Sequence, residues 1–224
     1  MNFEQFELND MQYLVRYPDG FDPSKRYPTI LLLHGAGTRG RDLEKLKGNA
    51  FFTLTEEYEN FPFVVFAPQC SKNSWFDQFE TLRKFVKQIA ATPFVDPTHL
   101  YMTGSSMGGY GTWQLAMSMP KYFAAIAPVC GGGMYWNAAR LVNVPVWAFH
   151  GALDKTVRLE ESEKMVNAVN KKNGNARLTV YPDVGHHAWT PTYSNPELFE
   201  WFLSHKNENA KELVNEYTDA KLFG

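Results

Sequence analysis

Tyr101-Met102-Thr103-Gly104-Ser105-Ser106-Met107-Gly108-Gly109 holds the pattern Gly-x-Ser-x-Gly between an apolar run and a run with helical character. A serine at this place stands on a sharp strand-to-helix turn, and the glycines on either side let the turn close without Cβ clashes. Ser106 is therefore a candidate nucleophile. Ser105 is its rival, although it lacks the symmetrical flanking glycines. The pattern alone is common, so the rest of the chain must supply a base, an acid and an oxyanion hole.

Apolar runs alternate with helical segments on both sides of this stretch. The expected strands lie at 11–17, 27–33, 61–67, 100–104, 123–130, 144–149 and 176–181, and the expected helices at 49–58, 75–91, 107–119, 160–172 and 196–205. Continuous apolar runs are typical of strands buried on both faces of a parallel sheet. The pattern predicts an α/β fold whose mostly parallel sheet carries helices on both faces.

The size of the chain favours a single domain over residues 1–224. Residues 206–224 form a polar C-terminal helix or tail, for which Leu213, Tyr217 and Leu222 are candidate docking residues.

Composition narrows the possible partners. The formal net charge is -2 without a basic block, which argues against nucleic acid as a partner. The N-terminus lacks the apolar stretch of a secretory signal, and no segment is long enough to span a bilayer, so we expect a cytoplasmic protein without a membrane partner. Aromatic residues make up 15% of the chain, which fits a pocket lined with rings. The oligomeric state is left open.

The remaining candidate groups all follow predicted strands. Ligands of such sheets bind beyond the carboxyl ends of the strands, so these groups are expected to converge. The turn His34-Gly35-Ala36-Gly37 is a candidate oxyanion loop, with backbone N–H donors from Ala36 and Met107. Asp154 is the candidate acid, and Asp183 is its rival.

The candidate base is His186 or His187, in Gly185-His186-His187-Ala188-Trp189. We favour His186 because it follows the glycine directly. The order Ser106, Asp154, His186 is the Ser…Asp…His order of one class of hydrolases. His34 is a candidate for shaping the oxyanion loop, whereas His99, His150 and His205 are given no role.

Other kinds of site lack support in the pattern. No His, Asp and Cys spacing resembles a metal-ligand set. Residues 104–109 lack the Lys-Ser/Thr ending of a phosphate-binding loop. Cys70 and Cys130 stand at the ends of apolar runs and are interpreted as buried free thiols.

Over residues 11–205 the chain resembles the α/β-hydrolase superfamily. Within it the chain is similar to compact bacterial serine esterases grouped near dienelactone hydrolases, phospholipase/carboxylesterases, polyhydroxybutyrate depolymerases and feruloyl esterases. The motifs that carry this resemblance are Leu33-His34-Gly35-Ala36-Gly37, Gly104-Ser105-Ser106-Met107-Gly108-Gly109, Pro128-Val129-Cys130-Gly131-Gly132-Gly133, and Gly185-His186-His187-Ala188-Trp189 leading to Asn195-Pro196-Glu197-Leu198.

The resemblance implies ester hydrolysis through an acyl-enzyme, with a Ser106, His186 and Asp154 triad and neither cofactor nor metal. Dienelactone hydrolases have a cysteine nucleophile, so the serine at position 106 does not imply lactone specificity. No long insertion separates the strands near Cys130 and Val144, where many lipases carry a lid. We therefore expect an open site for small short-chain or aryl (feruloyl-type) esters.

Three tryptophans are candidates for the wall of the pocket, namely Trp75, Trp136 and Trp189. Trp75-Phe76-Asp77 resembles a pocket segment of carboxylesterases.

Three alternatives to a small-ester hydrolase are retained. A serine peptidase of the same fold usually has an added gating domain, for which 224 residues leave no room. A non-catalytic scaffold would not need an intact triad. A polyester depolymerase would normally carry a signal and a substrate-binding module.

Overall fold

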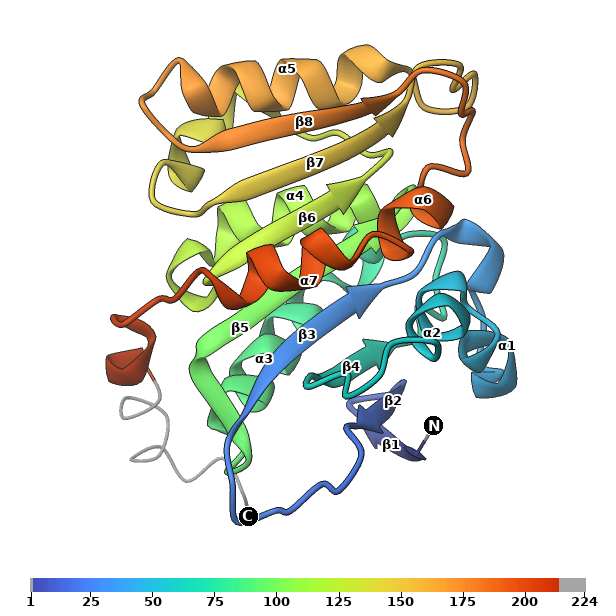
Figure 1. Cartoon of the computed structure of the whole chain (residues 1–224), viewed down its shortest axis with the longest axis vertical. Coiled ribbons are helices and arrows are strands. Elements are labelled where there is room, and N and C mark those ends of the chain that lie inside the picture. Colours follow the sequence, from blue (N-terminus) through green and yellow to red (C-terminus); the bar gives the residue numbers. More distant parts are fainter. Residues whose placement is uncertain (1, 214–224) are drawn as a thin grey trace.

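One eight-stranded sheet organises the molecule. In the computed structural model, which describes residues 2–213, the strands lie in the order β1-β2-β4-β3-β5-β6-β7-β8. β1 and β2 are antiparallel to their neighbours, and β3 to β8 run parallel to one another. Helices cover both faces of the sheet (Figure 1). The predicted mostly parallel α/β sheet is confirmed.

The elements have the following bounds. The strands are β1 (Asn2–Leu8), β2 (Met11–Tyr17), β3 (Tyr27–Leu33), β4 (Val64–Pro68), β5 (Val95–Ser105), β6 (Ala125–Val129), β7 (Val146–Gly151) and β8 (Ala176–Tyr181). The α-helices are α1 (Leu43–Lys47), α2 (Ala50–Thr55), α3 (Phe79–Ala91), α4 (Met107–Ser118), α5 (Leu159–Asn170), α6 (Trp189–Tyr193) and α7 (Pro196–Leu203). The 3-10 helices are η1 (Ala36–Thr38), η2 (Trp75–Gln78), η3 (Pro120–Tyr122) and η4 (Tyr135–Leu141).

Alternation along the strands builds one apolar core on each face of the sheet. Leu31 and Leu33 of β3 point into the core formed with α3, α4 and α5. Ile30 and Leu32 point into the core formed with α1, α2, α6 and α7. Successive side chains of a strand face opposite sides, so one continuous apolar run supplies both cores.

β1 was not predicted from the sequence. Its residues are mostly exposed, and the strand pairs with β2 along its whole length at the edge of the sheet. Two rings attach it to the rest of the molecule, since Phe3 meets Phe52 edge-on at 4.9 Å and Phe6 stacks on Tyr13 at 5.4 Å. A charged edge strand has no apolar run, because it is not buried on both faces.

Two further elements differ from the sequence prediction. The predicted helix at 75–91 divides into η2 and α3, and Ser74 and Asp77 close η2 with a capping box. The segment between β6 and β7, for which no helix was predicted, contains η4, which packs against α4 and α5.

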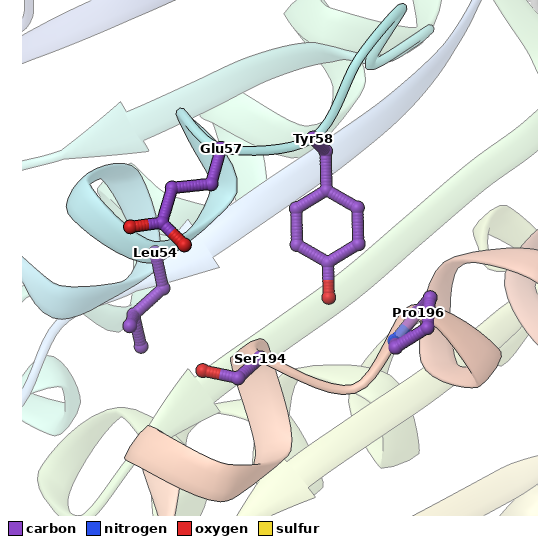
Figure 2. A pocket seen from close by; sticks show the side chains of 5 residues that line it. All are labelled: Leu54, Glu57, Tyr58, Ser194 and Pro196. Atoms are coloured by element: carbon purple, nitrogen blue, oxygen red, sulfur yellow. The ribbon is translucent and has the colours of Figure 1, made fainter.

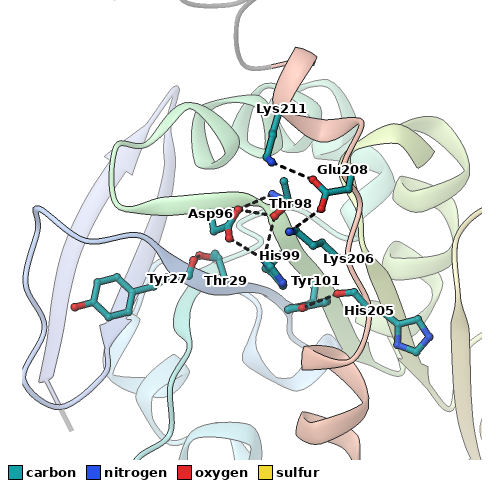
Figure 3. A network of polar contacts seen from close by, with 10 residues as sticks. All are labelled: Tyr27, Thr29, Asp96, Thr98, His99, Tyr101, His205, Lys206, Glu208 and Lys211. Atoms are coloured by element: carbon teal, nitrogen blue, oxygen red, sulfur yellow. Dashed lines mark hydrogen bonds and ion pairs between the residues drawn. The ribbon is translucent and has the colours of Figure 1, made fainter.

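The described part of the C-terminal segment crosses the sheet at the end where β5 begins. Figure 3 shows Asp96 accepting from Thr98 and facing His99 at 2.7 Å, while the Tyr101 hydroxyl donates to the His205 carbonyl. The N–H of Asn207 also donates to the Thr98 carbonyl. Leu213 packs on the apolar core, whereas Tyr217 and Leu222 lie outside the described residues. This attachment lies at the opposite end of β5 from Ser106.

At the other end of β5, the backbones of β3, β5 and α4 meet with no room for side chains. A Cβ on Gly104 would lie 2.6 Å from the carbonyl oxygens of Leu33 and Gly108. A Cβ on Gly108 would overlap the Leu33 carbonyl outright. Glycine is thus required at both positions, because the atoms in the way are backbone atoms that cannot turn aside.

We expect Gly108→Ala to lower the free energy of unfolding by about 3 kcal/mol or more, or to prevent folding, because the strand and the helix must separate. Gly37→Ala is the matched control, since a Cβ there meets nothing within 4 Å. Urea unfolding followed by circular dichroism measures both variants. Equal stability of the two variants would contradict the steric explanation.

Candidate active site

Ser106 stands between β5 and α4 in a backbone conformation that few residues adopt. Its φ is 56° and its ψ is -117°, in the positive-φ region that disfavours a Cβ. The Ser106 N–H donates to the Val129 carbonyl of β6 at 3.0 Å, and its own carbonyl accepts from Tyr110 N in α4. The hydrogen bonds on both sides fix the turn, so the side chain projects at the carboxyl edge of the sheet.

Three of the predicted site residues form one hydrogen-bonded chain. His186 Nε2 lies 2.9 Å from Ser106 Oγ, and His186 Nδ1 lies 2.7 Å from Asp154 Oδ2. The rival residues do not join it: His187 is exposed and stacks on Trp189 at 4.8 Å, and Asp183 is exposed. The structure therefore brings together Ser106, Asp154 and His186 from loops that follow three different strands.

The loops that carry Asp154 and His186 are joined through their backbones. Ala152 N donates to the Tyr181 carbonyl and Leu153 N to the Val184 carbonyl, both at 2.9 Å. Gly151 makes this approach possible, because a Cβ there would overlap the Val184 carbonyl. The distance between the carboxylate and the imidazole is thus set by backbone contacts.

Asp154 is held as a buried carboxylate. Its Oδ1 accepts from the N–H groups of Thr156 at 2.8 Å and Val157 at 2.9 Å. Burial pushes the pKa of Asp154 upward, but the hydrogen bonds from His186, Val157 and Thr156 outweigh it, so the pKa lies below its usual value. Asp154 is therefore ionised at neutral pH and can orient His186.

A second histidine, His150, contacts the same carboxylate and was given no role in the sequence analysis. It is fully buried, with Nε2 2.9 Å from the Val157 carbonyl and 3.4 Å from Asp154 Oδ2. Its Nδ1 lies 2.8 Å from Ser162 Oγ. His150 thus fastens the turn at 154–157 to α5. Its position four residues before Asp154, directly after an apolar strand, was the available signal.

The predicted oxyanion loop lies against the Ser106 turn. A Cβ on Gly35 would be 3.6 Å from Ser106 Cβ and 3.3 Å from the Ser105 carbonyl. Ala36 begins η1 and Met107 begins α4, and the first N–H groups of a helix have no acceptor within it. Both N–H groups are thus available at the same edge as Ser106.

His34 holds this loop in place through its buried side chain and its carbonyl. It is fully buried, and its Nε2 accepts from Cys70 N at 2.9 Å, while its carbonyl accepts from Trp75 Nε1 at 3.0 Å. Burial lowers the pKa of His34 to about 4, and the Gly35 carbonyl, which lies 2.7 Å from Nδ1, partly opposes this. The imidazole is therefore neutral at pH 7, as its role as an acceptor for Cys70 requires.

The three tryptophans proposed as pocket walls differ in position. Trp75 has no exposed surface, so its side chain supports the oxyanion loop instead of facing a substrate. Trp136 is 72% exposed in η4. Gly133, three residues before Trp136, lies against Trp113 of α4. Only Trp189, which lies edge-on to His186 at 5.4 Å, is beside the site.

Two exposed apolar side chains are neighbours of candidate site residues in the chain. Phe76 follows Trp75 and is 52% exposed, and Leu153 precedes Asp154 and is 59% exposed. Phe76 was quoted from the sequence within the segment Trp75-Phe76-Asp77, whereas Leu153 was not selected.

A pocket of about 210 Å³ lies elsewhere, between α2 and the junction of α6 and α7. Figure 2 shows its lining, which consists of Leu54, Glu57, Tyr58, Ser194 and Pro196 and includes none of the predicted site residues. Among residues 2–213, no helix is long and apolar enough to cross a membrane.

Comparison with known proteins matches residues 63–222 to the model of the dienelactone hydrolase family. A probable feruloyl esterase C of Aspergillus terreus is 24% identical over 75% of this chain and 63% of its own length. A putative carboxymethylenebutenolidase of Escherichia coli O157:H7 is 30% identical over 48% of this chain and 46% of its own length. The chain thus spans less than two thirds of the length of either relative.

Solved structures agree on the fold. A thermostable esterase is 30% identical with a TM-score of 0.81, covering 91% of this chain and 63% of that one. Est1E from Butyrivibrio proteoclasticus, 15% identical, has a TM-score of 0.67 and covers 91% of this chain and 100% of its own. The chain has the α/β-hydrolase fold, as the sequence predicted.

Burial of His34 makes stability depend on pH. An unfolded histidine has a pKa of about 6.5, so the unfolded chain takes up a proton that the folded chain excludes until about pH 4. We expect the contribution to be complete above pH 6.5 and to be lost as the pH falls toward 4, by about 3 kcal/mol in all. Urea unfolding of wild type and His34→Gln across this range measures it.

The matched control is His187→Gln, which changes an exposed histidine. It should keep the wild-type pH dependence, whereas His34→Gln should flatten it. A His34→Gln profile parallel to wild type would show that another group causes the loss.

Proposed function

The chain belongs to the dienelactone hydrolase family, and from this premise we propose that it hydrolyses carboxylic esters through an acyl-enzyme formed on Ser106. The observation that carries the proposal is the unbroken hydrogen-bond chain from Ser106 Oγ through His186 to Asp154. A serine hydroxyl is a weak nucleophile by itself and needs an adjacent base that a third group orients. All three groups are present at hydrogen-bonding distance.

Acylation begins when Ser106 Oγ attacks the ester carbonyl carbon. His186 Nε2 removes the hydroxyl proton, and Asp154 stabilises the imidazolium that results. The carbonyl oxygen becomes an oxyanion, for which we assign the N–H groups of Ala36 and Met107 as donors. The tetrahedral intermediate collapses when His186 returns the proton to the departing alkoxide, and the alcohol leaves.

Deacylation repeats these steps with water. His186 removes a proton from the water that attacks the acyl carbon, and a second oxyanion forms beside the same two N–H groups. The bond between the acyl carbon and Ser106 Oγ then breaks, Oγ takes the proton from His186, and the carboxylic acid is released. No group outside the described loops is needed for either half-reaction.

We assign small esters, of the short-chain or aryl type, as substrates. Between β6 and β7, Tyr135–Leu141 form η4, which packs against α4 and α5 and supports the absence of a lid from this part of the described residues. The exposed ring of Phe76 and the half-buried ring of Trp189 flank loops of the site and suit a flat aryl group. The feruloyl esterase name of the Aspergillus terreus relative supports the aryl assignment.

Ser106→Ala removes the nucleophile, so we expect kcat/KM for p-nitrophenyl acetate to fall by a factor of about 10⁴ or more. The substituted residue keeps its Cβ, and the variant should unfold in urea like wild type. Ser105→Ala is the matched control and should keep most of the activity. Activity lost in Ser105→Ala and retained in Ser106→Ala would reverse the assignment.

The two adjacent histidines offer a direct comparison for the base. His186→Ala should lose activity nearly as severely as Ser106→Ala, because a triad acts as a unit. His187→Ala should stay active, since its ring points to solvent and stacks on Trp189. Kinetics on p-nitrophenyl acetate decide between them, and an inactive His187→Ala beside an active His186→Ala would move the base by one position.

The substrate class is tested with p-nitrophenyl acetate through octanoate, beside methyl ferulate and a peptide p-nitroanilide. We expect kcat/KM to be highest for the short-chain esters or the ferulate, because η4, in the segment between β6 and β7, packs against α4 and α5. Turnover of the anilide above the esters would favour the peptidase alternative. A steady rise toward octanoate would contradict the small-ester assignment.

A further inference from the structure

A thiol that ester hydrolysis does not use lies beside the Ser106, His186 and Asp154 cluster. Cys130 follows β6 and is fully buried, with a φ of 39° and with its N–H donating to the Phe149 carbonyl at 2.8 Å. One ligand-type atom each from Cys130, Asp154 and His186 lies within 4.8 Å of the other two. A thiol, a carboxylate and an imidazole thus meet at one point.

We infer that these three side chains form an inhibitory binding site for a divalent cation of the Zn²⁺ or Cd²⁺ type, with Cys130 Sγ, Asp154 Oδ2 and His186 Nδ1 as ligands. Sulfur, nitrogen and oxygen are the ligand atoms that Zn²⁺ takes in proteins, and three protein ligands leave a fourth position for water. The binding of the cation is independent of the proposed function, and only the loss of activity rests on it.

The distances are close to those of a metal site. Bonds of about 2.0 to 2.3 Å place tetrahedral ligand atoms about 3.3 to 3.8 Å apart. His186 Nδ1 and Asp154 Oδ2 are now 2.7 Å apart and hydrogen-bonded, and the Cys130 sulfur lies within 4.8 Å of one ring nitrogen of His186 and one carboxylate oxygen of Asp154. To bind a metal ion, His186 Nδ1 and Asp154 Oδ2 must move slightly apart, and Cys130 Sγ must move slightly closer to both.

The electrostatics of the site favour a cation. Burial raises the pKa of the Cys130 thiol to about 12, the Ser106 N–H partly opposes this, and the Asp154 charge adds to it. Tyr110 and Tyr193 also face the thiol, and burial raises the pKa of both, so both are neutral. A bound divalent ion would balance the negative charges of the buried Asp154 carboxylate and of the sulfur that coordinates it.

The proton inventory explains why binding would stop the reaction. The thiol releases one proton to solvent when the sulfur–metal bond forms. The proton on His186 Nδ1 is displaced by the metal, and Nε2 takes up a proton, so the ring stays neutral in the opposite tautomer. With a proton on Nε2, His186 can no longer accept the Ser106 hydroxyl proton.

Cd²⁺ is the spectroscopic probe, because a cadmium thiolate has an ultraviolet charge-transfer band. The full-length chain is titrated as wild type, Cys130→Ala, Cys70→Ala and Ser106→Ala. Cys70 is the matched control, since it is the other buried free cysteine and stands outside any such three-ligand cluster of the described residues. Ser106→Ala removes the esterase reaction and leaves all three proposed ligands.

We expect one saturable band in wild type, Cys70→Ala and Ser106→Ala and none in Cys130→Ala. The Zn²⁺ concentration that halves esterase activity should rise about tenfold or more in Cys130→Ala, measured against that variant's own activity. Loss of a metal ligand should lower metal affinity at least as much as loss of a residue that hydrogen-bonds to a ligand. Cys130→Ser, which keeps the shape of the side chain, repeats the comparison if the alanine variant does not fold.

A cadmium band that persists in Cys130→Ala and disappears in Cys70→Ala would overturn the inference, as would the absence of a band in folded wild type. A band in Ser106→Ala together with no esterase activity in wild type would retain the metal site and reject the proposed function instead.

Discussion

The backbone contact between β3, β5 and α4 is the constraint on which the site depends. Gly104 and Gly108 let these three elements meet at the Leu33 carbonyl, and Ser106 stands between the two glycines. The positive φ of Ser106 costs on the order of 1 to 3 kcal/mol, and such a conformation persists only when surrounding contacts hold it in place. Here they do, because β6 holds the Ser106 N–H and α4 holds its carbonyl.

The same edge of the sheet gathers the other groups by similar close approaches. Gly35 meets the Ser106 turn, and Gly151 meets the loop before His186. Each contact joins backbone to backbone, so the positions of the side chains follow from the fold and depend little on their own flexibility. This explains how His186 reaches hydrogen-bonding distance of Ser106, 80 positions before it in the sequence, and of Asp154, 32 positions before it.

The sequence predicted what local pattern determines and missed what packing determines. β2, β3 and β8 were predicted with their observed bounds, because alternating or continuous apolar runs mark buried strands. β1 and α6 have no such run and were missed. The grouping of Ser106, Asp154 and His186 could be predicted from the sequence motifs and from the order of the three residues along the chain.

Other features depend on long-range contacts that no spacing displays. Whether a tryptophan such as Trp75 is covered depends on which loop lies above it. A three-ligand cluster was excluded on spacing, although the sheet brings Cys130 to residues 24 and 56 positions further along the chain. His150 likewise contacts Asp154 only because the intervening turn closes on it.

The negative charge of buried Asp154 affects both His186 and Cys130. Asp154 keeps its charge although it is buried, because two backbone N–H groups, His186 and His150 surround it. In the proposed reaction that negative potential would stabilise the His186 imidazolium, and it opposes ionisation of the neighbouring Cys130 thiol. The same negative potential that would stabilise the His186 imidazolium would also attract a divalent metal ion, and Cys130 supplies the soft sulfur ligand that would hold it. An alanine at position 130 would leave the carboxylate–imidazole pair intact and remove that susceptibility, so the thiol separates catalysis from metal binding within a single cluster.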